Sequence, residues 1–174
     1  MIDTRQQAGK HTIKDKYFEE HGIKIVRSKL PVGDYGCMQD MSVICDSKNS
    51  IDELCSDVIQ DHERFRRELL LAQDNGIKLY IVVENSVKCL NAKQNIWNPR
   101  IRDLKDLHNW KNPRLFVFQH GKQKYPTATR GVTLMKACMT MQQKYGCEFL
   151  FCSPEASAPM ILKLLGIEES EENG

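Results

Sequence analysis

The chain has 174 residues, 28% charged and 41% hydrophobic, and its 25 basic and 23 acidic residues leave a formal net charge of +2. This length predicts one domain with a buried core and excludes a chain that is disordered throughout. No apolar run approaches the roughly 18 residues that span a bilayer, and the first residues do not begin a secretory signal, so we expect an intracellular, cytoplasmic protein without membrane contact.

The amino-terminal part predicts one helix followed by short strands. Residues 14–21 form a helical pattern that Gly22 closes, and residues 23–30 alternate as a half-buried strand. A turn over residues 31–34 leads into two strands over 35–38 and 42–46. Because only a short turn separates the last two strands, the sheet should be partly antiparallel.

A helical region and a buried strand follow. Ser50 and Glu53 have the spacing of a capping box that opens a helix, and a second helix over about 61–74 ends at Asn75-Gly76. Residues 78–84 are almost continuously apolar, which is typical of a strand buried on both faces.

The carboxyl-terminal part repeats the alternation. A helix over about 130–145 ends at Gly146, a strand covers 147–152, and a last helix covers 154–165. Residues 167–174 are acidic and predict a frayed tail. Strands that alternate with helices predict an α/β fold with a sheet covered on both faces.

Seven cysteines are scattered through apolar segments, and none forms a C-x-x-C pair. This pattern is typical of reduced thiols that pack in a core, argues against a zinc site and agrees with a reducing compartment. Their positions are 37, 45, 55, 89, 138, 147 and 152.

The charge is unevenly distributed. Residues 88–130 contain ten basic and two acidic residues, a net charge of +8, so the rest of the chain carries −6. Both tryptophans, Trp97 and Trp110, lie in the same segment. Cations interleaved with rings suit a nucleic-acid surface, where cations replace counterions and rings stack on unpaired bases. A solvated loop whose aromatic residues anchor it to the core fits equally well.

The strongest chemical pattern is Gly33-Asp34, followed by Asp46-Ser47-Lys48. A hairpin could bring Asp34 and Asp46 together, and a divalent cation relieves the repulsion between two such carboxylates. Lys48 projects to the same side of an extended segment as Asp46 and could stabilise charge on an attacked phosphate. The alternative is that Asp34 is a turn residue and that Asp46 and Lys48 are surface charges.

Several motifs in order resemble the XPF-type nuclease domain of the PD-(D/E)xK restriction-endonuclease-like superfamily. The resemblance spans residues 1 to about 86 and, more loosely, 130–165. It implies a three-layer α/β fold with a central mixed β-sheet flanked by helices. It predicts one nuclease domain over 1–166, with a basic, aromatic-rich insert at 88–127 and an acidic tail at 167–174. The motifs are Ile2-Asp3-Thr4-Arg5, Leu30-Pro31-Val32-Gly33-Asp34-Tyr35, Val43-Ile44-Cys45-Asp46-Ser47-Lys48, Asp52 with Leu54, Arg64-Phe65 and Ile81-Val82-Val83-Glu84.

The resemblance also implies roles for individual residues. Asp34 and Asp46 would hold Mg²⁺ or Mn²⁺ together with the carbonyl of Ser47, and Lys48 would be the catalytic lysine. Four further residues would support the site: Asp3, Arg5, Asp52 and Arg64. Members of this family cut branched DNA such as flaps and forks, which are intermediates of DNA repair and recombination, and they pair as homodimers or heterodimers.

Three positions depart from the family pattern. Asp46 stands where the family has a glutamate, which keeps the charge but shortens the side chain by one methylene, and Ser47 stands where the family has an arginine. Gln6 stands where an acid usually follows Arg5. The chain also has no room for the tandem helix-hairpin-helix domain that usually follows, and the insert could supply the missing DNA contacts through Lys105, Lys111, Lys122 and Lys124.

Three functions fit this pattern. The first is a metal-dependent DNA endonuclease that acts on branched DNA. The second, which Gln6 and Ser47 favour, is a catalytically silent DNA-binding or scaffold module of the same fold. The third is a small α/β metalloenzyme with a substrate other than nucleic acid.

Overall fold

The structure, a computed structural model, describes residues 1–4 and 12–167. Its centre is a six-stranded sheet in which three strands are parallel and the next one is antiparallel to them. This mixed sheet confirms the expected α/β class. In sheet order the strands are β10 (Glu148–Cys152), β5 (Lys78–Glu84), β4 (Val43–Lys48), β3 (Tyr35–Gly36), β1 (Ile2–Asp3) and β2 (Arg27–Ser28).

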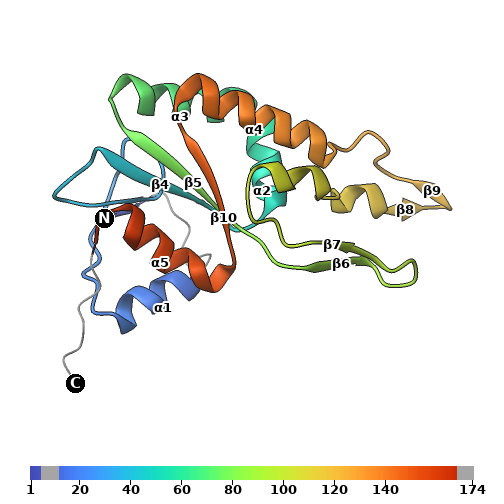
Figure 1. Cartoon of the computed structure of the whole chain (residues 1–174), viewed down its shortest axis with the longest axis horizontal. Coiled ribbons are helices and arrows are strands. Elements are labelled where there is room, and N and C mark those ends of the chain that lie inside the picture. Colours follow the sequence, from blue (N-terminus) through green and yellow to red (C-terminus); the bar gives the residue numbers. More distant parts are fainter. Residues whose placement is uncertain (5–11, 168–174) are drawn as a thin grey trace.

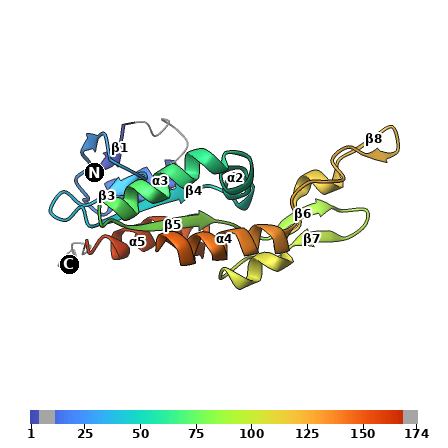
Figure 2. The ribbon, with the colours of Figure 1, turned by 90° about the horizontal axis from the view of Figure 1, so that it is seen from above.

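Helices cover both faces of the sheet (Figures 1 and 2). One face packs against α2 (Ile51–Cys55), the π-helical segment η1 (Ser56–Gln60), α3 (His62–Asp74) and α4 (Gly131–Tyr145). The other face packs against α1 (Thr12–Glu20) and α5 (Pro154–Leu164). Each face of the sheet therefore has its own apolar core, as in a three-layer fold.

Local signals in the sequence explain where several helices and strands begin and end. The side chain of Ser50 accepts a hydrogen bond from the backbone N–H of Glu53, and the Glu53 carboxylate accepts one from the N–H of Asn49. Gly146 ends α4 in the left-handed conformation, with φ of 69°. β5 has the predicted bounds, and its apolar residues contribute to both cores.

The predicted strand over residues 23–30 is too long. Only Arg27–Ser28 form a strand, β2, because their partner β1 is two residues long. A ladder cannot extend beyond the shorter of its two strands, and the remaining alternating residues lie outside it.

The insert at 88–127 forms two hairpins that project beyond one end of the sheet (Figure 2). The first pairs β6 (Lys88–Asn91) with β7 (Ile96–Asn98), and the second pairs β8 (Phe118–Gln119) with β9 (Lys122–Gln123). The 3₁₀ helices η2 (Lys105–Asn109) and η3 (Pro113–Phe116) connect the two hairpins. Among the described residues, no helix has the length and apolar character that a membrane span requires.

The middle of the insert belongs to the core. Ile101, Leu107 and Trp110 are buried in the cluster that also contains α3 and α4. The expectation of aromatic anchoring is therefore confirmed for Trp110, whereas Trp97 on β7 is 47% exposed.

Candidate functional site

The candidate site lies on β4, the strand between β3 and β5. Alternate residues of a strand face opposite sides, so Asp46 and Lys48 both point toward α2 and α3. Both side chains are buried, with relative exposures of 5% for Asp46 and 6% for Lys48. A charge at such a depth requires a partner, because burial removes its hydration.

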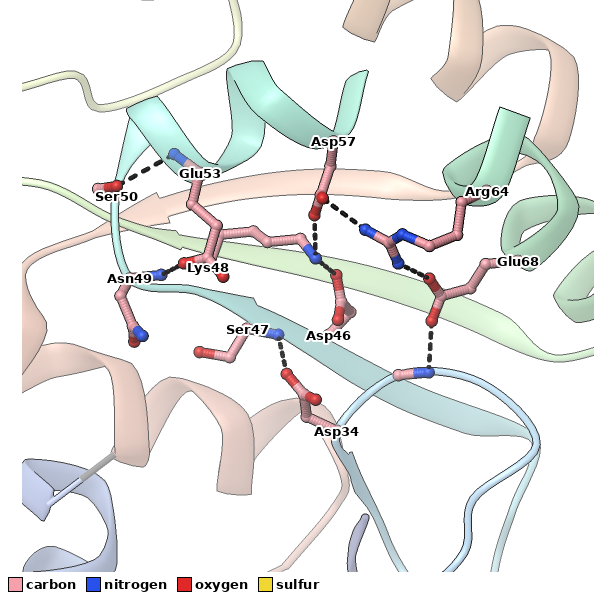
Figure 3. A network of polar contacts seen from close by, with 11 residues as sticks. Asp34, Asp46, Ser47, Lys48, Asn49, Ser50, Glu53, Asp57, Arg64 and Glu68 are labelled. Carbon is pink, nitrogen blue, oxygen red and sulfur yellow. Dashed lines mark hydrogen bonds and ion pairs between the residues drawn. The ribbon is translucent and has the colours of Figure 1, made fainter. Parts of the chain in front are cut away.

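Two carboxylates surround the ammonium group of Lys48. Its Nζ lies 2.6 Å from Oδ2 of Asp46 and 2.6 Å from Oδ2 of Asp57 (Figure 3). Burial opposes the charge on Lys48, but these two carboxylates outweigh burial and raise its pKa above the usual value. Lys48 therefore stays protonated throughout the physiological pH range.

The backbone positions Asp34 next to this pair. Its N–H donates to the carbonyl of Cys45 (2.9 Å), and its own carbonyl accepts from the N–H of Asp3 (2.8 Å). The carboxylate then accepts a hydrogen bond from the N–H of Ser47 through Oδ2 (2.9 Å). The turn that precedes β3 thus aims Asp34 at the middle of β4.

Gly33 is required in this turn for two reasons. Its φ is +62°, a conformation that L side chains rarely adopt, and a Cβ would lie 2.7 Å from a side-chain methyl of Ile44. Gly33 therefore allows the turn to pack closely against β4, which places Asp34 beside that strand.

The charges of Asp34 and Asp46 oppose each other. Burial, and then the charge of Asp46, raise the pKa of Asp34 to about 8. The pKa of Glu68 on α3 is raised by the same two causes. A bound cation would reduce the electrostatic repulsion between these carboxylates.

Asp57, Arg64 and Glu68 form a second layer on η1 and α3 (Figure 3). Arg64 bonds Oδ1 of Asp57 through Nη2 (2.5 Å) and lies 3.8 Å from Oε2 of Glu68 through Nη1. Glu68 in turn accepts a hydrogen bond from the N–H of Gly33 through Oε1 (2.9 Å). One chain of contacts therefore links Lys48 to the turn that carries Asp34.

Sequence reasoning missed Asp57 and Glu68. The sequence contains one signal for Glu68: it lies four residues after Arg64, and this spacing places the two side chains on the same helical face. Asp57 gave no such signal, because it lies in a π-helical turn whose extra residue changes the direction of the side chains.

The other predicted site residues lie in different surroundings. Asp3 is buried on β1, where its Oδ2 accepts a hydrogen bond from the N–H of Leu30 (2.7 Å) and so holds the loop before Gly33. Asp52 is exposed on α2 and contacts none of Asp34, Asp46 and Lys48 through a hydrogen bond or ion pair within the described ranges. Arg5 and Gln6 lie outside the described residues. The four predicted DNA-binding lysines of the insert, Lys105, Lys111, Lys122 and Lys124, are exposed.

The acidic pair partly meets the requirements of a divalent cation. In each of Asp34 and Asp46, Oδ2 is engaged as described above, whereas Oδ1 makes no hydrogen bond or ion pair within residues 1–4 and 12–167. Those residues contain no group of three histidine, cysteine or acidic side chains arranged for a metal. A cation would therefore need these two carboxylates together with backbone carbonyls, such as that of Ser47, and water or substrate oxygens.

Cys45 directly precedes Asp46 on β4, and its thiol is chemically inert. Burial, and then the charges of Asp46 and Asp34, raise the pKa of its thiol to about 12. A thiol in this environment remains protonated and does not act as a nucleophile.

The mixed sheet, its two helical layers and the carboxylate–lysine cluster on β4 define a nuclease-like α/β domain. The chain belongs to the ERCC4 domain family, whose match covers residues 2–164. A comparison with curated proteins gives no match.

Two similar solved structures are of XPF from Aeropyrum pernix. One has 18% sequence identity and a TM-score of 0.55, over 98% of this chain and 66% of that one. The other, a complex with DNA, has 17% identity and a TM-score of 0.59, over 95% and 62% of the two chains. The chain thus spans slightly less than two thirds of either relative, and the likeness confirms the XPF-type nuclease fold.

Proposed function

We propose that this domain is a metal-dependent endonuclease that hydrolyses phosphodiester bonds in DNA, with flaps and forks as its substrates. The observation that carries the proposal is the placement of Asp34 against β4, beside Asp46 and Lys48. Membership of the ERCC4 domain family supports it, and one similar structure, XPF from Aeropyrum pernix, is a complex with DNA.

Each residue has a distinct part in this proposal. Asp34, Asp46 and the carbonyl of Ser47 would hold Mg²⁺ or Mn²⁺, which when bound polarises a phosphate and makes a water molecule more acidic. Lys48 stays protonated and stabilises the negative charge that develops on the phosphate. Asp57 fixes the position of the Lys48 ammonium, and Glu68 fixes the turn that carries Asp34.

Cleavage of labelled DNA tests the proposal. The wild-type chain should cut flap or fork DNA in Mg²⁺ or Mn²⁺ and leave it intact in EDTA. Asp34→Asn and Lys48→Ala should each reduce the rate by about a hundred-fold or more, because each removes a charge from the reacting centre. Asp74→Asn is the matched control, since Asp74 is exposed at the end of α3. Equal cutting by all four proteins would refute the assigned site.

A silent DNA-binding module is the second candidate. The enclosure of Lys48 by Asp46 and Asp57, at 6% exposure, favours it because a buried ammonium has no free path to a phosphate. This candidate predicts that the wild-type chain binds forked DNA but leaves it uncut in both metals.

A further inference from the structure

We infer that the two hairpins of the insert bind an unpaired nucleic-acid strand, with Trp97 and Phe118 stacking on its bases. The inference deepens the proposed function, since it rests on DNA as the substrate and names the part of the DNA that the hairpins bind. It depends on three features of the insert: its exposed rings, the rigidity of Trp97 and its unpaired cations.

The exposed aromatic rings are confined to the insert. Throughout residues 1–4 and 12–167, the exposed Trp, Phe and Tyr side chains are Trp97 (47%), Phe118 (56%) and Tyr125 (38%). The sheet and its covering helices expose none, so these rings are not a general property of the surface. Trp97 lies on β7 of the first hairpin, Phe118 lies on β8 of the second, and Tyr125 follows β9.

Trp97 is held in place although it is exposed. Its Nε1 donates to Oδ1 of Asn95 (2.8 Å), a residue with a positive φ of 51° at the end of the β6–β7 turn. Its carbonyl accepts a hydrogen bond from Nζ of Lys111 (3.1 Å). The adjacent Asn98 is buried and exchanges two hydrogen bonds with the backbone of Lys111, at 2.7 and 2.8 Å. The ring is therefore ordered before any ligand arrives, which lowers the entropic cost of stacking.

The cations around the rings have no acidic partners. Within the described part of the chain, none of the basic residues of the insert forms an ion pair. Arg114 and Lys124 instead lie over the ring of Tyr125, 5.7 and 5.3 Å from its centroid. The net charge of +8 over residues 88–130 is thus available to a polyanion.

The combination favours an unpaired strand over a duplex. Cations alone would suit either ligand, because both carry phosphates. Exposed rings gain stacking energy only from bases whose faces are free, and a duplex buries those faces in its own stack. The insert also tolerates any base sequence under this inference, because every base has an aromatic face.

Intrinsic fluorescence can test the contact directly, since the chain has only two tryptophans and Trp110 is 4% exposed. The wild-type chain in EDTA is titrated with oligo(dT) and with a duplex of equal length. Oligo(dT) should quench the fluorescence, and Trp97→Phe should abolish the quenching while it keeps most of the affinity. Trp97→Ala and Phe118→Ala should each weaken oligo(dT) binding about ten-fold and leave duplex binding unchanged. Met139→Ala, an exposed change on α4, is the matched control.

The contribution of charge is tested by glutamine at Lys105, Lys111, Lys122 and Lys124. This variant should reduce the slope of log affinity against log salt by about 3, since each phosphate contact contributes about 0.7 for a single strand. The matched control places glutamine at four exposed lysines outside the insert, Lys24, Lys136, Lys144 and Lys163.

The inference is overturned if Trp97→Ala and Phe118→Ala leave oligo(dT) affinity unchanged, or weaken duplex binding equally. These measurements contain no metal and no cleavage step, so they are independent of the proposed activity. If oligo(dT) binding depends on Trp97 and Phe118 but flap and fork DNA stay uncut in Mg²⁺ and Mn²⁺, the endonuclease is refuted and the inference about the hairpins is kept. If the wild-type chain cuts flap or fork DNA while Trp97→Ala and Phe118→Ala bind oligo(dT) normally, the inference is refuted and the endonuclease is kept.

Discussion

Lys48 is the residue on which the contacts of the candidate site converge. Its ammonium joins Asp46 on the same strand to Asp57 on η1, and its Nζ lies 5.5 Å from the centroid of the Phe65 ring. A buried lysine with one carboxylate would be paired but free to move. With two carboxylates on different elements, the ammonium has one defined position, which a residue acting on a phosphate requires.

Removal of the charge of Asp57 should affect both stability and cleavage. Asp57→Asn removes one of the two carboxylate partners of Arg64 and weakens one of the two ion pairs of Lys48. We expect a loss of about 1–3 kcal/mol in the free energy of unfolding, measured by urea denaturation. Cleavage in Mg²⁺ should fall by about ten- to a hundred-fold, because the ammonium is no longer fixed.

Asp61→Asn is the control for this variant, since Asp61 is exposed beside η1 and makes no side-chain cap hydrogen bond. It should change neither quantity. A normal cleavage rate in Asp57→Asn would show that Asp46 alone positions Lys48.

The raised pKa of Asp34 predicts a pH dependence of stability in the absence of metal. The pKa of Asp34 in the folded state, about 8, lies well above the ordinary value for an aspartate, so the folded state binds this proton more tightly than the unfolded state does. The contribution of Asp34 to stability is therefore greatest below about pH 4 and falls by up to about 1.4 kcal/mol per pH unit as the pH rises toward 8. Thermal denaturation in EDTA should reveal the decline.

Asp34→Asn should remove this contribution, and Asp74→Asn should retain it. Added Mg²⁺ should reduce the decline in the wild-type chain, because a cation favours the ionised carboxylate. A pH profile that is identical in wild type and Asp34→Asn would contradict the assignment of the raised pKa to Asp34.

At the scale of elements, the turn before β3 and the η1–α3 segment together build the site. The turn supplies Asp34, and η1 and α3 supply the residues that hold Lys48 and Gly33. Neither segment can form the site alone, since the turn lies beside β4 in the sheet, whereas η1 and α3 cover one face of β4. Displacement of α3 should therefore disturb both the lysine and the acidic pair.

The junction between the insert and α4 depends on a glycine. A Cβ on Gly131 would lie 2.2 Å from the carbonyl oxygen of Leu107 and 2.4 Å from that of Trp110. Gly131→Ala therefore forces α4 and η2 apart and should cost about 1–3 kcal/mol in the free energy of unfolding. Urea denaturation measures the loss, and the emission of the buried Trp110 should shift to longer wavelength.

Thr133→Ala is the matched control, because Thr133 is exposed in the first turn of the same helix. Its unfolding should resemble that of the wild-type chain. An unchanged midpoint in Gly131→Ala would mean that the contact between α4 and η2 relaxes without cost.

At the scale of the whole molecule, net charge and exposed Trp, Phe and Tyr rings are segregated. The sheet and its helices hold the acidic pair, and the insert carries a net positive charge and the exposed rings beyond one end of the sheet (Figures 1 and 2). Acidic groups that bind a cation would repel a DNA backbone, whereas a basic element on the same chain attracts it. The near-neutral sum of +2 therefore combines two regions of opposite charge.

Much of this organisation follows from the sequence alone. The bounds of β5, the Ser50–Glu53 cap and the end of α4 at Gly146 depend on local periodicity and backbone conformation, which neighbouring residues determine. The family resemblance, which the ERCC4 domain match confirms, rests on the order and spacing of short motifs, so it can also be detected from the sequence alone.

Only the tertiary structure decided the partners of these residues. Asp57 and Glu68 reach the site because η1 is a π-helical turn and α3 packs over β4. Trp110 is buried and Trp97 is exposed because α4 covers only the base of the insert. Such contacts join residues that are distant in the chain. Their free energy depends on burial and distance, which local sequence patterns do not encode.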